Sequence, residues 1–346
     1  MEISNNKVHV YKDLYFESPK IPAKNKIQGY GLPKKDQKWK RTELPEWWKE
    51  MVQDLSDIES SLMTLEKQLD VKEKKIEAGI REGKKLSRTS LNPIIEAIND
   101  LVVRYDVVHT KIETFAFEED RKCTEGIWFY NYNPQTGESD PIFITGDHYH
   151  YLNWFKLDGL YANYRERDKR WFYHWWICDN DSDSLGQAYG KLRRDGYSFR
   201  VMSIIYNRAR KTFDTKYGIM SKSVKDTNEM FNKGVNAFVN YPLFFKPQVY
   251  TAEDPKDKIV FKTPQQRVTY KTRTARKEVS LNTEIESFAP NENAMDGSKR
   301  KIIGADEAAK LPKDVSIEKW FNVGKRCCFL GRIIVGKILF GSTVNE

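Results

Sequence analysis

Between residues 184 and 343, short apolar runs alternate with longer amphipathic stretches. The runs include KYGIMS, KIIGADEA and RIIVGKILFGST, and the longer stretches include YSFRVMSIIYNRARKTF and SVKDTNEMFNKGVNAFVNY. A short apolar run suits a buried strand, whereas the longer stretches have the residue spacing of helices. Strands and helices that alternate along a chain form mostly parallel sheets with helices on their faces. We therefore predict an α/β fold with a mostly parallel sheet for this part of the chain.

Residues 44–118 carry two heptad patterns instead. Apolar residues recur at alternating steps of four and three from Met51 to Ile76, and again from Ile94 to Phe115. Pro93 suits the first turn of the second helix, with Asn92 as a candidate cap. Two amphipathic helices joined by a polar turn predict an antiparallel helical hairpin. Two roles fit such a hairpin: an interacting or lid-like element, or a helical decoration packed on the main domain.

These patterns divide the chain into three parts. Residues 1–43 are rich in Lys, Pro and Gly and predict an extended N-terminal arm, followed by the hairpin at 44–118 and a main domain at 119–346. Within the main domain, GIWFYNYNPQTGESDPIFITG predicts two short strands around a polar turn. Residues 147–181 predict helix, with their many aromatic rings in the core.

Charge is concentrated in one window of the sequence. The whole chain has a net charge of +9, and residues 181–280 hold 20 basic and 10 acidic residues, so that this window alone carries +10. Such a segment fits a phosphate or nucleic-acid partner, or else a solvated lysine-rich surface. Four cysteines are too few for a disulfide scaffold, and the N-terminus lacks an apolar signal core. We expect a protein of a reducing compartment that is neither secreted nor bound to a membrane.

The stretch GKLRRDGYS, residues 190–198, resembles a phosphate-binding loop with a displaced lysine. The common loop has Gly, four residues, Gly, Lys and then Ser or Thr. Here five residues separate Gly190 and Gly196, Tyr197 follows the second glycine, and Lys191 follows the first. The candidate ATP-binding residues are Gly190, Lys191, Leu192, Arg193, Arg194, Asp195, Gly196, Tyr197 and Ser198. In this interpretation Lys191 neutralises the β and γ phosphates and Ser198 contributes to a Mg²⁺ site. The alternative is a basic turn without a ligand.

The run KIIGADEA ends in an acidic pair. An apolar strand that ends in Asp-Glu is the Walker B arrangement, in which Asp306 would hold Mg²⁺ and Glu307 would polarise the attacking water. An exposed acidic pair at a strand end is the simpler alternative. The last strand, ILFGST, ends in Gly341, Ser342 and Thr343, which would sense the γ-phosphate or the water unless they form an ordinary turn. The glycine loop, the strand that ends in Asp-Glu and the strand that ends in Ser-Thr follow one another in the order found in P-loop ATPases. We therefore predict Mg²⁺-dependent ATP hydrolysis.

Together, GKLRRDGYS, IIGADEA and FGST resemble the motifs of the large terminase subunit of tailed bacteriophages, and look closest to those of the crAss-like phages. Lys191 and Tyr197 match a variant of the family in which the loop lysine is displaced. The resemblance implies a P-loop NTPase fold of the ASCE type and a motor ATPase that drives double-stranded DNA into a procapsid. It further implies a portal protein and a small terminase subunit as partners, assembly into a ring, and action in the host cytoplasm during virion assembly.

The resemblance suggests two further groups of residues. ITGDHYHYLNWFKLDG occupies the place of the family's adenine-binding segment, so its rings are candidates to stack on adenine: Tyr149, Tyr151 and Trp154. A motor ATPase also needs an arginine at the γ-phosphate. Arg194 in the loop is a candidate catalytic residue, and the other candidates are Arg208, Arg210, Arg267, Arg273 and Arg276.

A full large terminase continues into a nuclease domain with clustered carboxylates. No such cluster follows Thr343, so we expect an ATPase portion without nuclease activity. The alternative function is a non-hydrolysing module that binds nucleic acid or a phage structural protein and carries a vestigial nucleotide loop.

Overall fold

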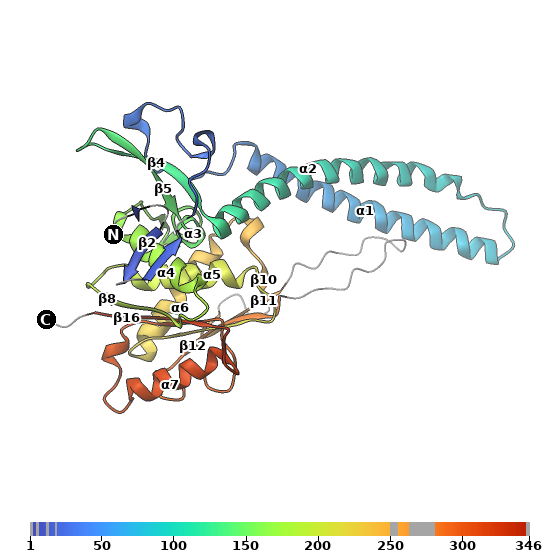
Figure 1. The fold of residues 1–346 in the computed structure, drawn as a ribbon. Helices are drawn as coiled ribbons and strands as arrows, with labels where there is room; N and C mark the ends of the chain where they lie inside the picture. The colour runs from blue at the N-terminus through green and yellow to red at the C-terminus, as the bar shows by residue number, and fades with distance from the viewer. Residues whose placement is uncertain are drawn as a thin grey trace. The chain divides into compact units, whose positions relative to one another are not determined.

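The computed structural model describes residues 19–249, 255–262 and 281–343, together with the backbone of three short strands, β1 (Ile3–Ser4), β2 (Lys7–Tyr11) and β3 (Leu14–Glu17). The described residues form two compact units (Figure 1). Residues 43–119 form a helical unit, and the segments before and after them form an α/β unit. Arg267, Arg273 and Arg276 lie outside the described residues.

The helical unit is an antiparallel hairpin, as the heptad patterns predict. Its long helices are α1 (Trp47–Arg81) and α2 (Asn92–Glu125), which lie side by side in Figure 1. Near the turn, the buried side chains of Leu69, Ile76 and Ile94 pack together. Asn92 has helical backbone angles and is the first residue of α2, so it is not a cap. Helix α2 instead follows directly after a 3₁₀ turn, η3 (Arg88–Leu91), and the Ser87 side chain caps this turn.

A seven-stranded sheet forms the centre of the α/β unit. In sheet order the strands are β10 (Gln248–Val249), β11 (Lys258–Lys262), β12 (Thr283–Phe288), β9 (Lys216–Met220), β13 (Ile302–Ala305), β16 (Lys337–Thr343) and β8 (Gly186–Lys191). The five strands from β12 to β8 pair in parallel, and β10 and β11 add an antiparallel margin. The predicted α/β fold with a mostly parallel sheet is confirmed.

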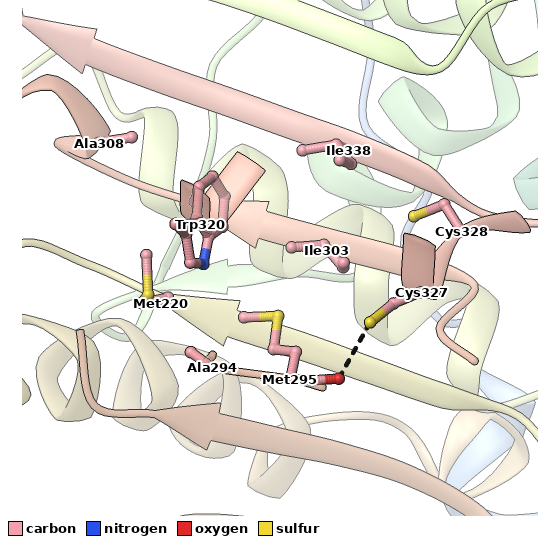
Figure 2. Packing of buried hydrophobic residues seen from close by; sticks show 10 residues of the cluster. Met220, Ala294, Met295, Ile303, Ala308, Trp320, Cys327, Cys328 and Ile338 are labelled. Atoms are coloured by element: carbon pink, nitrogen blue, oxygen red, sulfur yellow. Dashed lines mark hydrogen bonds between the residues drawn. The ribbon is translucent and has the colours of Figure 1, made fainter. Parts of the chain in front are cut away.

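Helices cover both faces of this sheet (Figure 1). On one face lie α5 (Tyr197–Ala209) and α6 (Val224–Val239), and on the other lies α7 (Ile317–Cys327). Figure 2 shows the core beneath α7, where Trp320 packs among Met220, Ile303 and Ile338. There the Cys327 thiol donates a hydrogen bond to the carbonyl oxygen of Met295 at 3.1 Å. All four cysteines are buried thiols rather than disulfides, as the composition predicts.

The segment before the sheet departs from the sequence prediction at one point. The hairpin of β4 (Ile127–Asn133) and β5 (Glu138–Ile144) forms as predicted. Residues 147–181, however, do not form one helix but two, α3 (Gly146–Asn153) and α4 (Glu166–Asn180). Between them Asp158 and Gly159, with φ of 48° and 91°, turn the chain between β6 (Lys156–Leu157) and β7 (Leu160–Tyr161). Asp-Gly is a favoured pair for such a tight hairpin turn, and this signal outweighs the helical pattern.

The remaining elements are short. They are the 3₁₀ turns η1 (Lys24–Lys26), η2 (Lys34–Asp36), η4 (Leu243–Phe245) and η5 (Ala308–Lys310), and the paired strands β14 (Phe329–Leu330) and β15 (Ile333–Ile334). Among the described residues, no helix has both the length and the apolar character needed to cross a membrane.

Candidate nucleotide site

Three adjacent parallel strands, β8, β16 and β13, end at the same edge of the sheet. Thr343 of β16 lies in register with Lys191 at the end of β8, and Phe340 lies in register with Ala305 at the end of β13. Asp306 and Glu307 follow Ala305 directly, and the loop after Lys191 leads into the N-terminus of α5. The carboxyl edge of a parallel sheet is where α/β proteins bind ligands, and helix N-termini favour anions. The carboxyl ends of these three strands therefore bring together the candidate side chains of the loop, the acidic pair and the last strand.

Lys191 lies between the two acidic residues. Its Nζ atom is 2.6 Å from Oδ1 of Asp306 and 2.9 Å from Oε1 of Glu307. Burial by itself lowers the pKa of Lys191, but the two carboxylates outweigh burial and the net shift of the pKa is upward. The lysine therefore stays protonated and neutralises much of the charge of the acidic pair in this arrangement.

Ser198 and Asp306 form the second contact of the site. The Oγ atom of Ser198, in the first turn of α5, donates a hydrogen bond of 2.5 Å to Oδ2 of Asp306. A hydroxyl and a carboxylate oxygen that converge on one point suit Mg²⁺, which prefers oxygen ligands and usually combines one or two carboxylates with substrate phosphates. Among the described residues, no cluster of three acidic, His or Cys side chains could hold a metal alone. If Mg²⁺ arrived with a nucleotide, Ser198 Oγ and Asp306 Oδ2 would be protein oxygens able to meet it here.

Glu307 is fixed from several sides. Its backbone is left-handed, with φ of 51°, and the hydroxyl of Thr343 donates to its Oε2 atom at 2.8 Å. Lys310 lies 3.3 Å from the same oxygen and also contacts Thr343. Burial by itself would raise the pKa of Glu307, but the hydrogen bonds from Lys191 and Thr343 lower this pKa to about 2. Glu307 is consequently ionised and oriented at neutral pH.

The loop differs in detail from the sequence prediction. Gly190 and Lys191 are the last two residues of β8, so the loop itself comprises residues 192–196. Gly196 precedes α5 with φ of 81°, a conformation that glycine adopts without strain. Leu192, Arg193 and Arg194 are exposed along the loop, and Arg194 is also left-handed, with φ of 58°. Arg193 and Arg194 are therefore exposed to solvent.

A buried charge network behind the loop was not anticipated from the sequence. The Asp195 carboxylate accepts a hydrogen bond of 3.0 Å from Tyr189, lies 2.8 Å from Nη1 of Arg167, and pairs with Arg200. Arg200 in turn lies 2.9 Å from Oδ1 of Asp168, and both side chains are fully buried. Asp195 therefore holds the loop in place through its side chain rather than offering that side chain to phosphate. The sequence contained one indication of this network, because Arg200 is a charged residue within the apolar pattern of α5.

Tyr197 and the end of β16 pack closely against each other. The Tyr197 ring is buried, and a Cβ atom at Gly341 would lie 2.4 Å from its Cζ atom. Glycine at 341 is thus required by this close approach. The Ser342 hydroxyl accepts a hydrogen bond of 3.3 Å from the backbone N–H of Ala309, which ties β16 to the turn after Glu307. Thr343, the next residue, hydrogen-bonds directly to Glu307.

The aromatic residues proposed to stack on adenine are buried. Tyr149, Tyr151 and Trp154 have exposed fractions of 0–1%. The Tyr149 hydroxyl lies 2.8 Å from the Thr42 hydroxyl, and the Trp154 ring packs against those of Phe244 and Phe245. This burial argues against the predicted stacking, because the rings already fill the core and offer no open face to a base.

Two of the candidate arginines are also engaged elsewhere. Arg208 lies 2.7 Å from Asp147 and 3.0 Å from Asp179, and Arg210 lies 2.5 Å from Asp120. Arg208 follows Ser198 by ten residues along one helix, which corresponds to about 15 Å at the α-helical rise of 1.5 Å per residue. Both are thus structural residues at the far end of α5. Arg194 is the remaining candidate among the described residues.

Solved structures that are similar to this chain include phage large terminases. No protein-family model and no curated protein matches the chain. Among solved structures, the large terminase of bacteriophage HK97 is similar, with 13% identity, a TM-score of 0.41, and coverage of 56% of this chain and 36% of that chain. The large terminase ATPase domain of Thermus phage P74-26 shows 13% identity and a TM-score of 0.39 over 54% of this chain and 66% of that chain. A large terminase from a thermophilic bacteriophage, solved with ADP, shows 11% identity and a TM-score of 0.31 over 45% of this chain and 32% of that chain.

The chain therefore shows low-identity structural similarity to phage large terminases and spans less than two thirds of each of these chains. No comparison supports the closer resemblance to the crAss-like group. The TM-scores of these three structures all lie below 0.5.

Proposed function

We propose that this chain binds and hydrolyses ATP together with Mg²⁺. The observation that carries the proposal is the convergence of five side chains from three strand ends and one helix N-terminus. Each lies within hydrogen-bonding distance of at least one other: Lys191, Ser198, Asp306, Glu307 and Thr343. A cation, a hydroxyl and two carboxylates at a helix N-terminus are the groups that phosphoryl transfer from a nucleotide requires.

Nucleotide binding involves an exchange of partners at Lys191. Its ammonium group now pairs with Asp306 and Glu307, and the phosphates of ATP would compete with these carboxylates for it. As Lys191 turns to the phosphates, Asp306 and Ser198 become available to hold Mg²⁺. Bound there, the metal ion supplies charge neutralisation to the β and γ phosphates.

The same exchange would activate Glu307. Its hydrogen bond from Lys191 is one of the interactions that lower its pKa, so departure of Lys191 makes this carboxylate more basic. Thr343 continues to hold Oε2 in place. The water oxygen then attacks the γ-phosphorus while Glu307 accepts the water proton, and the bond from the γ-phosphorus to its bridging oxygen breaks to release ADP and phosphate. Hydrolysis is thereby suppressed until a nucleotide draws Lys191 away.

The finer proposal is that ATP hydrolysis drives double-stranded DNA into a procapsid, as in a large terminase of the crAss-like kind. The support is the motif resemblance and the +10 charge of residues 181–280, which suits contact with DNA phosphates. A portal protein, a small terminase subunit and a ring of copies would be the partners. Arg194 would approach the γ-phosphate, and the rest of residues 190–198 would enclose the phosphates through backbone N–H groups.

The deciding experiment uses Glu307→Gln, which keeps the size of the side chain and removes its charge. We expect ATP turnover to fall roughly 100- to 10,000-fold, the range of a lost general base. Mg-ATP should still raise the melting temperature, because Lys191 and Ser198 remain. Glu229→Gln, on the exposed face of α6, is the matched control and should turn over normally. Near-normal turnover in Glu307→Gln would refute the role of Glu307, whereas wild-type protein with neither turnover nor a thermal shift would favour the non-hydrolysing interaction module.

A further inference from the structure

The two oxygens of the Glu307 carboxylate have different partners. Oε1 lies 2.9 Å from Nζ of Lys191. Oε2 accepts hydrogen bonds from the hydroxyl of Thr343 at 2.8 Å and from the backbone N–H of the same residue at 3.4 Å. Oε2 also lies 3.3 Å from Nζ of Lys310. The proposed departure of Lys191 therefore removes a contact of Oε1 and leaves these three contacts of Oε2 in place.

Lys310 is the last residue of η5, the 3₁₀ turn that follows the acidic pair. Its backbone N–H donates to the carbonyl oxygen of Glu307 at 2.8 Å, so the turn itself sets the spacing of these two residues. Its Nζ atom also donates a hydrogen bond to the hydroxyl of Thr343. The three side chains therefore form a closed triangle, in which Lys310 donates to Thr343, Thr343 donates to Glu307, and Lys310 pairs with Glu307 directly.

This triangle differs from an ordinary surface ion pair. An ion pair between exposed side chains holds its geometry weakly and contributes at most about 1 kcal/mol. The side chains of Lys310 and Glu307 are only 31% and 16% exposed, and Thr343 is 8% exposed. A second link, from the N–H of Ala309 to the hydroxyl of Ser342, ties the turn to the same strand end. The position of the Lys310 ammonium group beside Oε2 is therefore set by both the turn and the strand.

We propose that Lys310 is a positioning residue that fixes Oε2 of Glu307 and leaves Oε1 to accept the proton of the attacking water. A carboxylate that is anchored through one oxygen presents the other in a constant direction, so the proton acceptor is aligned before the nucleotide arrives. The water oxygen bonds to the γ-phosphorus, its proton passes to Oε1, and the bond from the γ-phosphorus to the bridging oxygen breaks to release ADP. Lys310 has this role only if the chain hydrolyses ATP as proposed above.

Direct binding of the phosphates is the alternative role for Lys310. Its contacts with Thr343 and Glu307 favour positioning, because they hold the ammonium group on Oε2 rather than beside Lys191. The two roles also differ in their kinetics. Loss of a phosphate-binding cation weakens the binding of ATP and raises KM, whereas loss of a positioning residue lowers kcat and leaves KM nearly unchanged.

The first test measures steady-state ATP hydrolysis by single variants. Lys310→Met nearly keeps the length of the side chain and removes its charge. We expect kcat to fall roughly 10- to 100-fold, with KM for ATP within about twofold of the wild-type value. Thr343→Val keeps the shape of the side chain, removes the hydroxyl and should cause a loss of similar size. The matched control is Lys313→Met, an exposed lysine three positions further along the chain, and it should turn over normally.

The double variant shows whether Lys310 and Thr343 act through the same oxygen. Residues that act as a unit have losses that do not multiply. Lys310→Met combined with Thr343→Val should therefore lower kcat by no more than about twofold beyond the larger single loss. Urea denaturation of each variant, measured beside the kinetics, separates a loss of kcat from a loss of folded protein.

A second test reads the triangle without any nucleotide. In ¹⁵N NMR of the lysine ammonium groups, the Lys310 signal is identified by its disappearance in Lys310→Met. We expect this signal to move in Thr343→Val and in Glu307→Gln, because one variant removes an acceptor of Nζ and the other removes the charge beside it. The same signal should stay in place in Lys313→Met.

Several outcomes would overturn the role of Lys310. A raised KM with unchanged kcat in Lys310→Met would assign it to the phosphates, and losses that multiply in the double variant would show that it acts apart from Thr343. A Lys310 signal that stays in place in both Thr343→Val and Glu307→Gln would contradict the triangle itself. Normal turnover in Lys310→Met beside a strong loss in Glu307→Gln would remove the role of Lys310 alone, whereas wild-type protein without turnover would remove the proposed hydrolysis as well.

Discussion

The Nζ atom of Lys191 lies 2.6 Å from Oδ1 of Asp306, so the cation expected to bind phosphate already pairs with the carboxylate expected to bind metal. The Oε1 atom of Glu307 lies 2.9 Å from the same nitrogen. The site is therefore internally neutralised, and a nucleotide and its metal must displace contacts that the protein makes with itself. The affinity for Mg-ATP therefore depends on two sets of contacts. One is the set that Lys191 loses with Asp306 and Glu307, and the other is the set that these residues gain with the phosphates and the metal.

Lys191→Met tests two roles of the lysine. In one it neutralises the phosphates of ATP, and in the other it competes with Mg²⁺ for the carboxylates of Asp306 and Glu307. Removing the ammonium group should lower ATP turnover roughly 100-fold or more, because a positive charge at the phosphates is lost. It should also raise the affinity of the nucleotide-free protein for Mg²⁺ by about tenfold, because Asp306 and Glu307 lose their competing cation. Steady-state ATPase rates and calorimetric titration with Mg²⁺ measure the two effects. Lys225→Met, exposed on α6, should change neither, and unchanged Mg²⁺ affinity in Lys191→Met would contradict the competition.

Arg200→Met tests the charge network behind the loop. It leaves the buried Asp168 and Asp195 carboxylates without their shared cation, so the free energy of unfolding should fall by about 3–5 kcal/mol. Lys34→Met removes the exposed ion pair with Glu138 and should cost at most about 1 kcal/mol. Urea denaturation of both variants makes the comparison. Equal losses in the two variants would show that the Arg200 network does not stabilise the fold.

Gly341→Ala tests the close approach of Tyr197. The new Cβ atom would lie 2.4 Å from the ring, so Tyr197 and the start of α5 must shift, at a cost of about 1–3 kcal/mol. Tyr197→Leu should recover part of this loss in the double variant, which a double-mutant cycle would measure. Gly324→Ala in α7 is the control, because its Cβ atom would make ordinary contacts of 3.7 and 3.9 Å with the side chains of Ile303 and Ile338. Additive effects of the two substitutions would argue against the contact.

Lys211 predicts a pH dependence of stability. Burial and the neighbouring Arg210 lower its pKa from 10.5 to about 8. Below about pH 8 the folded state must hold a charged, desolvated ammonium group, whereas between about pH 8 and 10.5 the folded state has lost the proton that the unfolded state retains. This group therefore makes stability rise with pH across that window. Lys211→Met should stabilise the protein by about 1 kcal/mol near pH 7, with the gain disappearing toward pH 10 in thermal melts. A gain that did not depend on pH would rule out titration of Lys211 as its cause.

Much of the fold was accessible from local pattern. Heptad spacing predicts α1 and α2, and apolar runs predict β9, β13 and β16, because these signals depend on which residues are neighbours in sequence. The prediction of one helix over residues 147–181 was wrong, since the turn at Asp158 and Gly159 interrupts it. The aromatic residues near Tyr149 were open to two interpretations, because a ring suited to stacking on a base is equally suited to a core.

The sequence by itself determined the alternation of strands and helices, and the order of lysine, acidic pair and terminal hydroxyls along the chain. Only the tertiary structure decided that Lys191 pairs with Asp306 and Glu307, that Asp195 turns toward Arg167 and Arg200, and that β8 pairs with β16. The physical reason is that these contacts join residues from different elements, Lys191 and Asp306 being more than 100 positions apart. Parallel pairing of β13, β16 and β8 brings such distant strand ends to one place.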